Sequence, residues 1–204
     1  MKRIFIFTVL LVLGSFTFFY FWASQSSVPK EEYFTKVTYH SNYEKQSKDT
    51  FSVTTFNIGY LSGMTNNLPI KRSKKFFADN LIKAKDVLVK MDADVIGFQE
   101  IDFGASRSMY CNQLDSIAIA LDYPVAYKSI NWDKKYVPFP YWPVSMHFGQ
   151  MISGQAILSR YPLEPVETIV LEKPLNASFV YNRFYLDRLI QVARVTMGNK
   201  EVIL

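Results

Sequence analysis

Cysteine is nearly absent from the sequence, which contains one among 204 residues. No disulfide can therefore form within the chain, and Cys111 is expected to be a buried small hydrophobic residue even if the protein is exported. Charge is also sparse, since 20% of the residues are charged and 49% are hydrophobic. This composition argues against a disordered chain and suits one globular domain, or at most two small ones.

A strong basic character is lacking as well, because the formal net charge is only +5. Proteins that bind nucleic acid by neutralising its phosphates usually have a denser basic face. The densest basic cluster consists of Lys71, Arg72, Lys74 and Lys75. We expect it to be the solvated start of a helix.

The first 24 residues have the composition of a membrane anchor. Lys2 and Arg3 precede an uncharged apolar run over residues 4–22, close to the length of about 20 residues that a bilayer span needs. We therefore expect an uncleaved signal anchor, although the small residues at 23–27 leave a cleaved signal peptide as the alternative. The positive pair places the N-terminus in the cytoplasm. The protein is then membrane-anchored with an extracytoplasmic domain, or secreted.

Residues 25–49 are polar and aperiodic, and we expect them to form a tether to a domain at residues 50–204. The domain begins with a strand at 50–58 that is apolar on both faces. Apolar residues at helical spacing then predict an amphipathic helix that contains Phe77, Leu81, Ala84, Leu88 and Met91. A buried strand at 94–98 follows directly.

The second half of the domain begins with another helix, which is predicted by the spacing of Tyr110, Leu114, Ile117 and Leu121. A short strand is expected at 124–130. Residues 131–150 contain three prolines and six aromatic residues without periodicity, which predicts a long binding loop. Further strands are predicted at 152–162, 166–171 and 188–197, with a hairpin turn at Gly198-Asn199 and a return strand from 200.

Two polar side chains follow strands and are candidate ligands. Glu100 comes at the exit of the strand in "DADVIGFQEID", residues 92–102, and Asn57 ends the strand at 50–58. Taken singly, each is more often an ordinary loop or turn residue, so further motifs are needed to assign a role.

Three stretches in this order resemble the endonuclease/exonuclease/phosphatase superfamily, which includes DNase I-like nucleases, neutral sphingomyelinases and inositol phosphatases. They are "TFNIG" at 55–59, "DADVIGFQEID" at 92–102 and "SGQAILSRYPL" at 153–163. The resemblance implies an α/β sandwich of two facing mixed sheets flanked by helices. It also implies that Asn57 and Glu100 are ligands of a catalytic Mg²⁺ or Mn²⁺.

The chemistry of these residues agrees with that implication. Mg²⁺ prefers oxygen ligands and keeps several waters, so an amide oxygen and a carboxylate are sufficient protein anchors. Such an ion can hold a phosphoryl oxygen and help to generate the attacking water. The resemblance thus implies a phosphodiester hydrolase whose substrate contains either a lipid head group or nucleic acid.

Departures from the family pattern indicate which branch of the superfamily the chain resembles least. Members that resemble AP endonucleases carry an acid, a lysine and a tyrosine where this chain has Gly59, Asp102 and Ile152. A role in DNA repair is therefore disfavoured.

The stretch at 99–121 instead resembles the membrane-associated branch related to GPI-lipid remodelling factors and sphingomyelinase-like members. Arg107, Ser108 and Gln113 match that branch. Arg107 and Arg188 are possible phosphate contacts, because a guanidinium fork suits phosphate geometry. The alternative is that each is a surface charge, at the start of a helix in the case of Arg107.

The catalytic histidine, Asp-x-Asn and Asp-His motifs of the family are missing. In the family the histidine follows the strand that begins here at 200, so the resemblance places the catalytic His and Asp positions beyond Leu204. The only histidines, His40 and His147, lie in no family motif. Without a general base the chain is expected to be inactive or nearly so, and to be a C-terminally truncated fragment of a longer reading frame.

Two alternatives remain. The first is a secreted DNase I-like nuclease that would also use Asn57 and Glu100. The second is a non-catalytic surface-binding module in which the loop at 131–150, with Trp132 and Trp142, contacts a membrane or carbohydrate. The expected partners are a phosphodiester substrate and, through residues 4–22, a membrane; no protein partner is implied.

Overall fold

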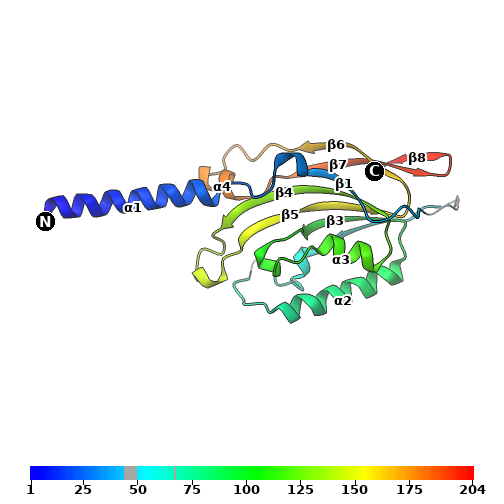
Figure 1. Ribbon diagram of the computed structural model, residues 1–204, viewed down its shortest axis with the longest axis horizontal. Helices are drawn as coiled ribbons and strands as arrows, with labels where there is room; N and C mark the ends of the chain where they lie inside the picture. The colour runs from blue at the N-terminus through cyan, green and yellow to red at the C-terminus, as the bar shows by residue number, and fades with distance from the viewer. Residues whose placement is uncertain (44–49, 67) are drawn as a thin grey trace.

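Two β-sheets face each other in the computed structural model of the protein, which describes residues 1–43, 50–66 and 68–204 (Figure 1). The first sheet has five strands in the order β1-β4-β5-β3-β2, and the second has three in the order β6-β7-β8. The strands of the first sheet are β1 (Phe34–Thr38), β2 (Val53–Asn57), β3 (Val95–Asp102), β4 (Val125–Val137) and β5 (Gly149–Ser159). Those of the second are β6 (Leu163–Val170), β7 (Leu189–Met197) and β8 (Lys200–Ile203).

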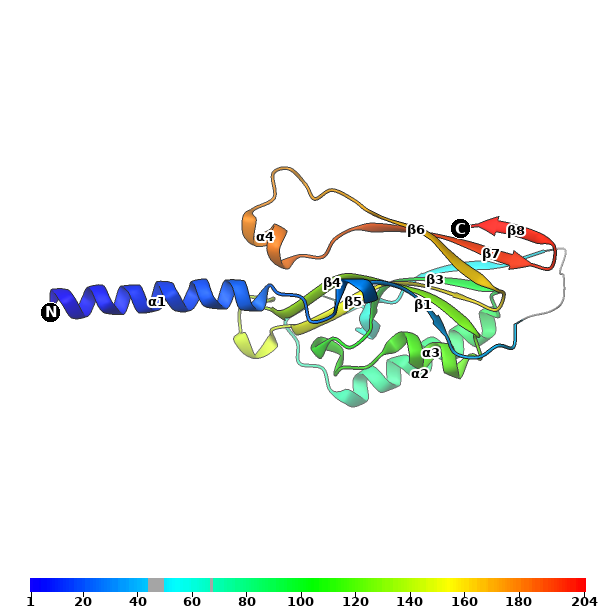
Figure 2. The ribbon, with the colours of Figure 1, turned by 45° about the horizontal axis from the view of Figure 1, so that its top comes forward.

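Two of the helices, α2 and α3, cover the face of the first sheet that points away from the second sheet (Figure 2). The α-helices are α1 (Lys2–Ala23), α2 (Lys74–Met91), α3 (Gln113–Ala120) and α4 (Phe179–Phe184). Short 3-10 turns are η1 (Lys30–Glu32), η2 (Gly59–Leu61), η3 (Ser106–Ser108) and η4 (Val144–Met146). The predicted fold class, an α/β sandwich of two facing mixed sheets flanked by helices, is confirmed.

The strand β3 shows why the core has two layers. Consecutive side chains of a strand point to opposite faces. Ile96 and Phe98 therefore pack against the helices, while Val95 packs between the two sheets against residues such as Val195. All four side chains are at most 1% exposed, so β3 is buried on both faces, as its apolar sequence predicts.

The two predicted amphipathic helices are present. The hydroxyl of Ser73 accepts a hydrogen bond from the Phe76 amide (3.1 Å) and caps α2, whose buried side chains are Phe77, Ala84 and Leu88. The helix α3 begins at Gln113, so Tyr110 lies outside it. Cys111 is only partly buried, 3.8 Å from the Ser116 hydroxyl, which corrects the expectation of a buried position.

The polar tether expected at residues 25–49 is wrong for much of its length. The strand β1 pairs antiparallel with β4, from Phe34 opposite Ser129 to Thr38 opposite Val125. The Tyr39 hydroxyl then donates to Asp115 on α3 (2.7 Å). The pairing satisfies backbone groups that the edge of β4 would otherwise expose, a long-range contact that the polar sequence does not show. Residues 44–49 lie outside the described residues.

The long loop expected at 131–150 is also shorter than predicted. The strand β4 continues to Val137 and β5 begins at Gly149, which leaves only 138–148 irregular. The sequence did not predict this part of β4 because it contains polar side chains. One of them, Asp133, is buried because it accepts hydrogen bonds from the backbone of an earlier segment. The aromatic residues divide accordingly: Trp132 and Phe148 are buried, whereas Tyr141 and Trp142 are exposed.

The later strands and the hairpin at Gly198-Asn199 agree with the sequence prediction. The helix α4 was not predicted. Among the described residues, α1 is the one helix long and apolar enough to cross a membrane, by length and composition; its mean hydropathy is 2.3 and none of the apolar window is buried.

The close approach of β5 to β4 gives a stability prediction. A Cβ atom at Gly154 would overlap the carbonyl oxygen of Ser129, whereas one at Gly97 on β3 would meet its nearest neighbour, the Thr54 carbonyl oxygen, at 3.9 Å. We expect Gly154→Ala to lower the free energy of unfolding by about 1–3 kcal/mol in urea denaturation, because strands must separate. Gly97→Ala is the matched control and should have little effect; equal losses would contradict the packing.

Candidate functional site

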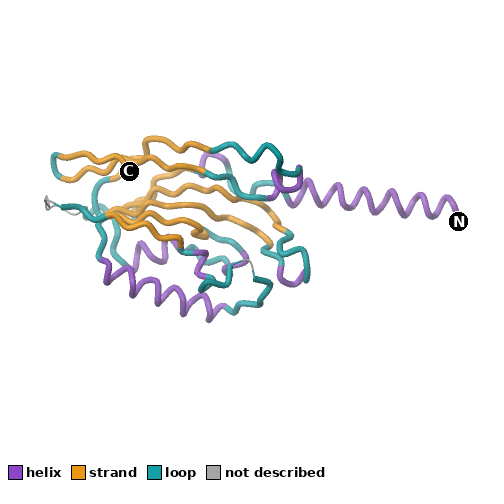
Figure 3. The backbone as a smooth tube through the Cα atoms, turned by 180° about the vertical axis from the view of Figure 1, so that it is seen from behind, coloured by secondary structure: helices purple, strands orange, loops and turns teal. Residues whose placement is uncertain are grey.

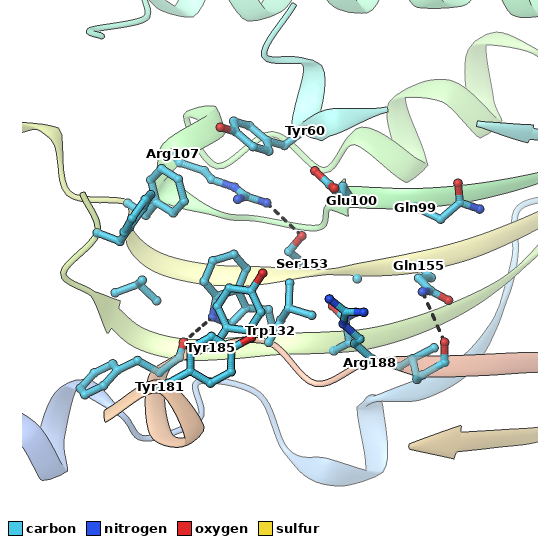
Figure 4. Close-up of a pocket in the computed structure, with 18 of the residues that line it drawn as sticks. Tyr60, Gln99, Glu100, Arg107, Trp132, Ser153, Gln155, Tyr181, Tyr185 and Arg188 are labelled. Carbon is cyan, nitrogen blue, oxygen red and sulfur yellow. Dashed lines mark hydrogen bonds between the residues drawn. The ribbon is translucent and has the colours of Figure 1, made fainter. Parts of the chain in front are cut away.

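A cavity of about 760 Å³ lies between the first sheet and α4 (Figure 4). Polar side chains of β2 and β3, namely Asn57, Gln99 and Glu100, line one part of it. Aromatic side chains of the 138–148 loop and of α4 line another part, as do Leu171 and Val180. The cavity thus combines a small polar end with a large apolar wall, as ligand sites usually do.

A β-bulge in β3 determines where Glu100 points. Phe98 pairs with Ala156 and Ile101 pairs with Gly154, so two residues, Gln99 and Glu100, oppose the single residue Gln155. Glu100 has a left-handed backbone with φ of 53°, which costs a non-glycine residue about 1–2 kcal/mol. Such bulges redirect side chains next to functional sites. The expected strand exit is therefore wrong: β3 continues to Asp102, and Glu100 is exposed because the strand is bulged there.

The parallel pairing of β2 with β3 places Asn57 beside Glu100. Asn57 pairs with Gln99 in the register, and its Nδ2 donates to Glu100 Oε1 (3.0 Å). Asn66 Nδ2 donates to the other oxygen, Glu100 Oε2 (3.3 Å). The structure thus brings the two predicted ligands together. It adds Asn66, which sequence reasoning missed because no motif surrounds it.

The donor chemistry at Glu100 fits a hard divalent cation. Glu100 and Asn57 are both exposed and offer a carboxylate and an amide oxygen. The Asn57 oxygen now accepts from the Gly59 amide (3.0 Å), and a flip of the side-chain amide would turn it toward Glu100. The described residues contain no group of three His, Cys, Asp or Glu side chains that could hold a metal. Water would therefore supply most ligands, as Mg²⁺ tolerates. The metal-binding role of both residues stays a prediction.

Arg107 is not a surface charge, as one interpretation of the sequence had it. Its Nη2 and Nε donate to the two carboxylate oxygens of Asp102 (2.8 and 3.1 Å), and its Nη2 also reaches Ser153 Oγ (3.3 Å). The side chains are 6% and 0% exposed, and the guanidinium lies 3.7 Å from the centre of the Tyr60 ring. Gln113 accepts from the Asp102 amide and donates to the Tyr60 carbonyl.

This network gives Asp102 a structural role at the position where family members that resemble AP endonucleases have a lysine. Here the acid at that position holds Arg107, and Gln113 ties both to η2. Arg107 nevertheless lines the cavity, so its contact with phosphate stays a prediction. With its charge balanced by Asp102, it is better suited to positioning Tyr60 and Ser153.

Arg188 lies across the cavity from Glu100, just before β7 (Figure 4). Its side chain is exposed, and its backbone carbonyl accepts from the Leu171 amide (2.8 Å), which links the ends of β6 and β7. The structure therefore places both predicted arginines on one cavity with Glu100. The phosphate role of Arg188 stays a prediction.

Leu204, beyond which the resemblance places the catalytic His and Asp positions, lies in the second sheet. Its amide donates to the Ala193 carbonyl (2.9 Å) and its carbonyl accepts from the Ala193 amide (3.0 Å), so the pairing of β8 with β7 continues through it. Its side chain is partly buried against the core between the sheets and does not line the cavity. The described residues do not test where the catalytic positions lie, and their place beyond Leu204 stays a prediction.

Trp132, Tyr181, Phe184 and Tyr185 line one side of the cavity, which we call the aromatic wall. Sequence reasoning missed it. Tyr181 and Tyr185 stack with ring centres 4.4 Å apart, and the Trp132 indole donates to the Phe184 carbonyl (2.8 Å). Burial, with Tyr185 adding to the effect, raises the pKa of the Tyr181 hydroxyl above its ordinary value. The aromatic-rich stretch at 179–185 was the available signal.

The buried pair of Asp102 and Arg107 gives a second prediction. Asp102→Ala leaves a buried guanidinium without its acid, so we expect the free energy of unfolding to fall by about 3–5 kcal/mol in urea denaturation. Glu201→Ala is the control, because its pair with Arg194 is exposed and weak (3.5 Å). Similar losses in the two variants would show that Asp102 contributes no more than a surface acid.

The backbone at Glu100 gives a third prediction. Glu100→Gly and Glu100→Ala both remove the carboxylate, but only glycine adopts a positive φ without strain. We expect the glycine variant to be more stable than the alanine variant by about 1 kcal/mol, measured by thermal and urea unfolding. If alanine is equal or better, the left-handed conformation at this position is refuted.

Comparison with solved structures gave weak similarities that carry no functional argument. An endonuclease/exonuclease/phosphatase from Beutenbergia cavernae is 16% identical with a TM-score of 0.46, over 75% of this chain and 36% of that chain. ANGEL2, a 2',3'-cyclic phosphatase, is 14% identical with a TM-score of 0.41, over 87% and 43%. The human Nocturnin catalytic domain is 13% identical with a TM-score of 0.38, over 87% and 54%. The chain thus spans between 36% and 54% of the length of these structures.

A comparison with curated proteins gave no match. The model of the Endonuclease/Exonuclease/phosphatase family matches residues 54–196, a range that includes most of β2 with Asn57, the bulge at Glu100 and most of β7. That match covers more than half of the sequence. The chain therefore belongs to the Endonuclease/Exonuclease/phosphatase family.

Proposed function

We propose that the chain carries the metal-binding part of a phosphodiester hydrolase, in which Glu100 and Asn57 hold a divalent cation, Mg²⁺ or Mn²⁺. Because the family's histidine motif is missing from the sequence, these residues by themselves should turn over a phosphodiester slowly or not at all. The observation that carries this proposal is the pairing of these two side chains at the polar end of the cavity, where adjacent parallel strands bring them to 3.0 Å. The backbone strain at Glu100 supports it, because a costly conformation persists where a side chain is needed in one direction.

Different residues of the cavity would bind different parts of the phosphodiester substrate. When bound, the ion would hold a phosphoryl oxygen and help to activate the attacking water. Arg188 faces the same cavity and supplies a guanidinium fork for a second phosphate oxygen. Arg107, paired with Asp102, fixes the position of Ser153 and of the Tyr60 ring beneath the substrate.

The substrate class that best suits the cavity is a phosphodiester with a large nonpolar part. Tyr181, Tyr185 and Leu171 form an apolar wall opposite Glu100, and this wall matches a lipid better than the charged backbone of nucleic acid. This supports placing the protein in the membrane-associated branch, with the GPI-lipid remodelling and sphingomyelinase-like members. Residues 1–24 would then be the anchor, with the N-terminus in the cytoplasm and the domain on the extracytoplasmic side.

Metal affinity tests this proposal directly. We expect Glu100→Gln to weaken Mn²⁺ binding by the purified full-length chain at least about tenfold, because the carboxylate of the proposed site is lost. Binding is measured by the electron paramagnetic resonance signal of free Mn²⁺ during titration.

The matched control is Glu167→Gln, which removes the same charge from an exposed position on β6. It should bind Mn²⁺ as the native chain does. Equal affinities of the native chain and the Glu100 variant would refute a metal site at Glu100, and an equal loss in the control would show that only net charge matters.

A further inference from the structure

The last turn of α1 packs against the domain through aromatic rings. Tyr20 contacts Phe179 and Phe184 of α4, with ring centres 5.9 and 5.6 Å apart. On its other side the helix contacts Tyr136 of β4 through Phe19 (5.8 Å) and Trp22. The helix is therefore held between α4 and the end of β4.

The segment that follows α1 is held to the domain by several hydrogen bonds close together in the sequence. Arg183 Nε donates to Ser24 Oγ (2.8 Å), and the Lys135 amide donates to the Gln25 carbonyl (2.8 Å). The amides of Ser27 and Val28 then donate to the two carboxylate oxygens of Asp133 (2.7 and 2.9 Å). These bonds fix the orientation of the domain relative to the axis of α1.

Exposed apolar side chains gather at the end of the domain from which α1 leaves. In Figure 2, α4 lies on one side of α1 and the 138–148 loop lies on the other. Tyr141, Trp142 and Val144 of the loop are 73%, 79% and 56% exposed, and Phe179 at the start of α4 is 73% exposed. We call these four residues the aromatic rim.

The rim has the composition of a membrane interface. The 22 residues of α1 would be about 33 Å long, which matches a hydrocarbon core of about 30 Å. Tyrosine and tryptophan concentrate at the boundary between hydrocarbon and water, where a ring is apolar and its polar group is hydrated. A rim beside the last turn of such a helix is located at that boundary.

The rim is also continuous with the cavity. Tyr141 belongs to the rim and lines the cavity, and Val180, next to Phe179, lines it as well. A lipid at the rim would thus meet the aromatic wall before it meets the polar end at Glu100.

We propose that the aromatic rim lies in the head-group layer of the bilayer that α1 crosses, so that the cavity receives phosphodiester lipids from that same bilayer. The inference rests on the proposed function in that α1 crosses a membrane and the cavity binds a phosphodiester. It does not depend on the metal site at Glu100.

Depth-dependent fluorescence quenching tests the proposal. Single cysteines replace Leu11, Val144 and Ile203, which are 57%, 56% and 57% exposed, in the full chain with Cys111→Ser. Each variant is labelled with an environment-sensitive fluorophore and reconstituted in phosphatidylcholine vesicles that contain spin-labelled lipid. Leu11 reports on α1, Val144 on the rim, and Ile203 on β8, which lies in the half of the domain away from α1 (Figure 1). A label at Trp142 repeats the rim measurement.

We expect the spin-labelled lipid to quench the label at 144 several-fold more than that at 203, and aqueous iodide to show the reverse order. Equal lipid quenching at 144 and 203, with the label at 11 quenched, overturns the rim proposal and leaves the membrane crossing intact. A label at 11 that is not quenched overturns both. Protection of 144 from iodide without lipid quenching also overturns the proposal, because a second copy or another protein then covers the rim.

The metal site is kept separate by repeating the measurement with Glu100→Gln. The lipid contact of the label at 144 should be unchanged in this variant, because Glu100 lies at the other end of the cavity. Loss of the contact on this substitution would show that the rim is not an independent surface.

Discussion

The geometry of the candidate site depends on one constraint of register between β3 and β5. Two residues, Gln99 and Glu100, occupy the space opposite the single residue Gln155, and the strand accommodates the extra residue with a left-handed backbone at Glu100. The bulge brings the carboxylate to Asn57 at the end of β2. Beyond it, pairing resumes at Ile101, and Asp102 is buried where it can hold Arg107. The metal candidate and the arginine network are thus two consequences of one irregularity.

The second organising feature is the set of hydrogen bonds that attach α1 to the end of the domain from which it projects (Figure 3). A flexible tether would let the domain rotate freely above a membrane, and the cavity would then have no fixed orientation relative to the bilayer. Here Asp133 and Arg183 bind the segment after α1, so that the helix and the domain have one relative orientation. The proposed lipid substrate agrees with this arrangement, because Phe184 of the aromatic wall contacts Tyr20 of α1, whereas Glu100 lies across the cavity from Tyr181 (Figure 4).

Local patterns predicted much of the fold, since α2, α3 and the late strands follow from spacing and turn residues. Contacts between distant segments were not predictable in this way. The strand β1 forms because β4 offers an unpaired edge, and β4 extends past Ile130 because Asp133 finds backbone partners far away in the sequence. At the site, the motifs identified Asn57 and Glu100, but the bulge, Asn66 and the aromatic wall depend on register and tertiary packing. Arg107 shows the same limit, because only the structure reveals that Asp102 neutralises it.

The proposed chemistry depends on a divalent cation that Glu100 and Asn57 hold at the polar end of the cavity. The most direct measurement is an anomalous-difference map from crystals of the full-length chain soaked in Mn²⁺. We expect a peak within about 2.3 Å of a Glu100 carboxylate oxygen, with the Asn57 amide turned so that its oxygen faces the ion. A map with no peak at Glu100, or with Mn²⁺ bound only elsewhere on the chain, would contradict it.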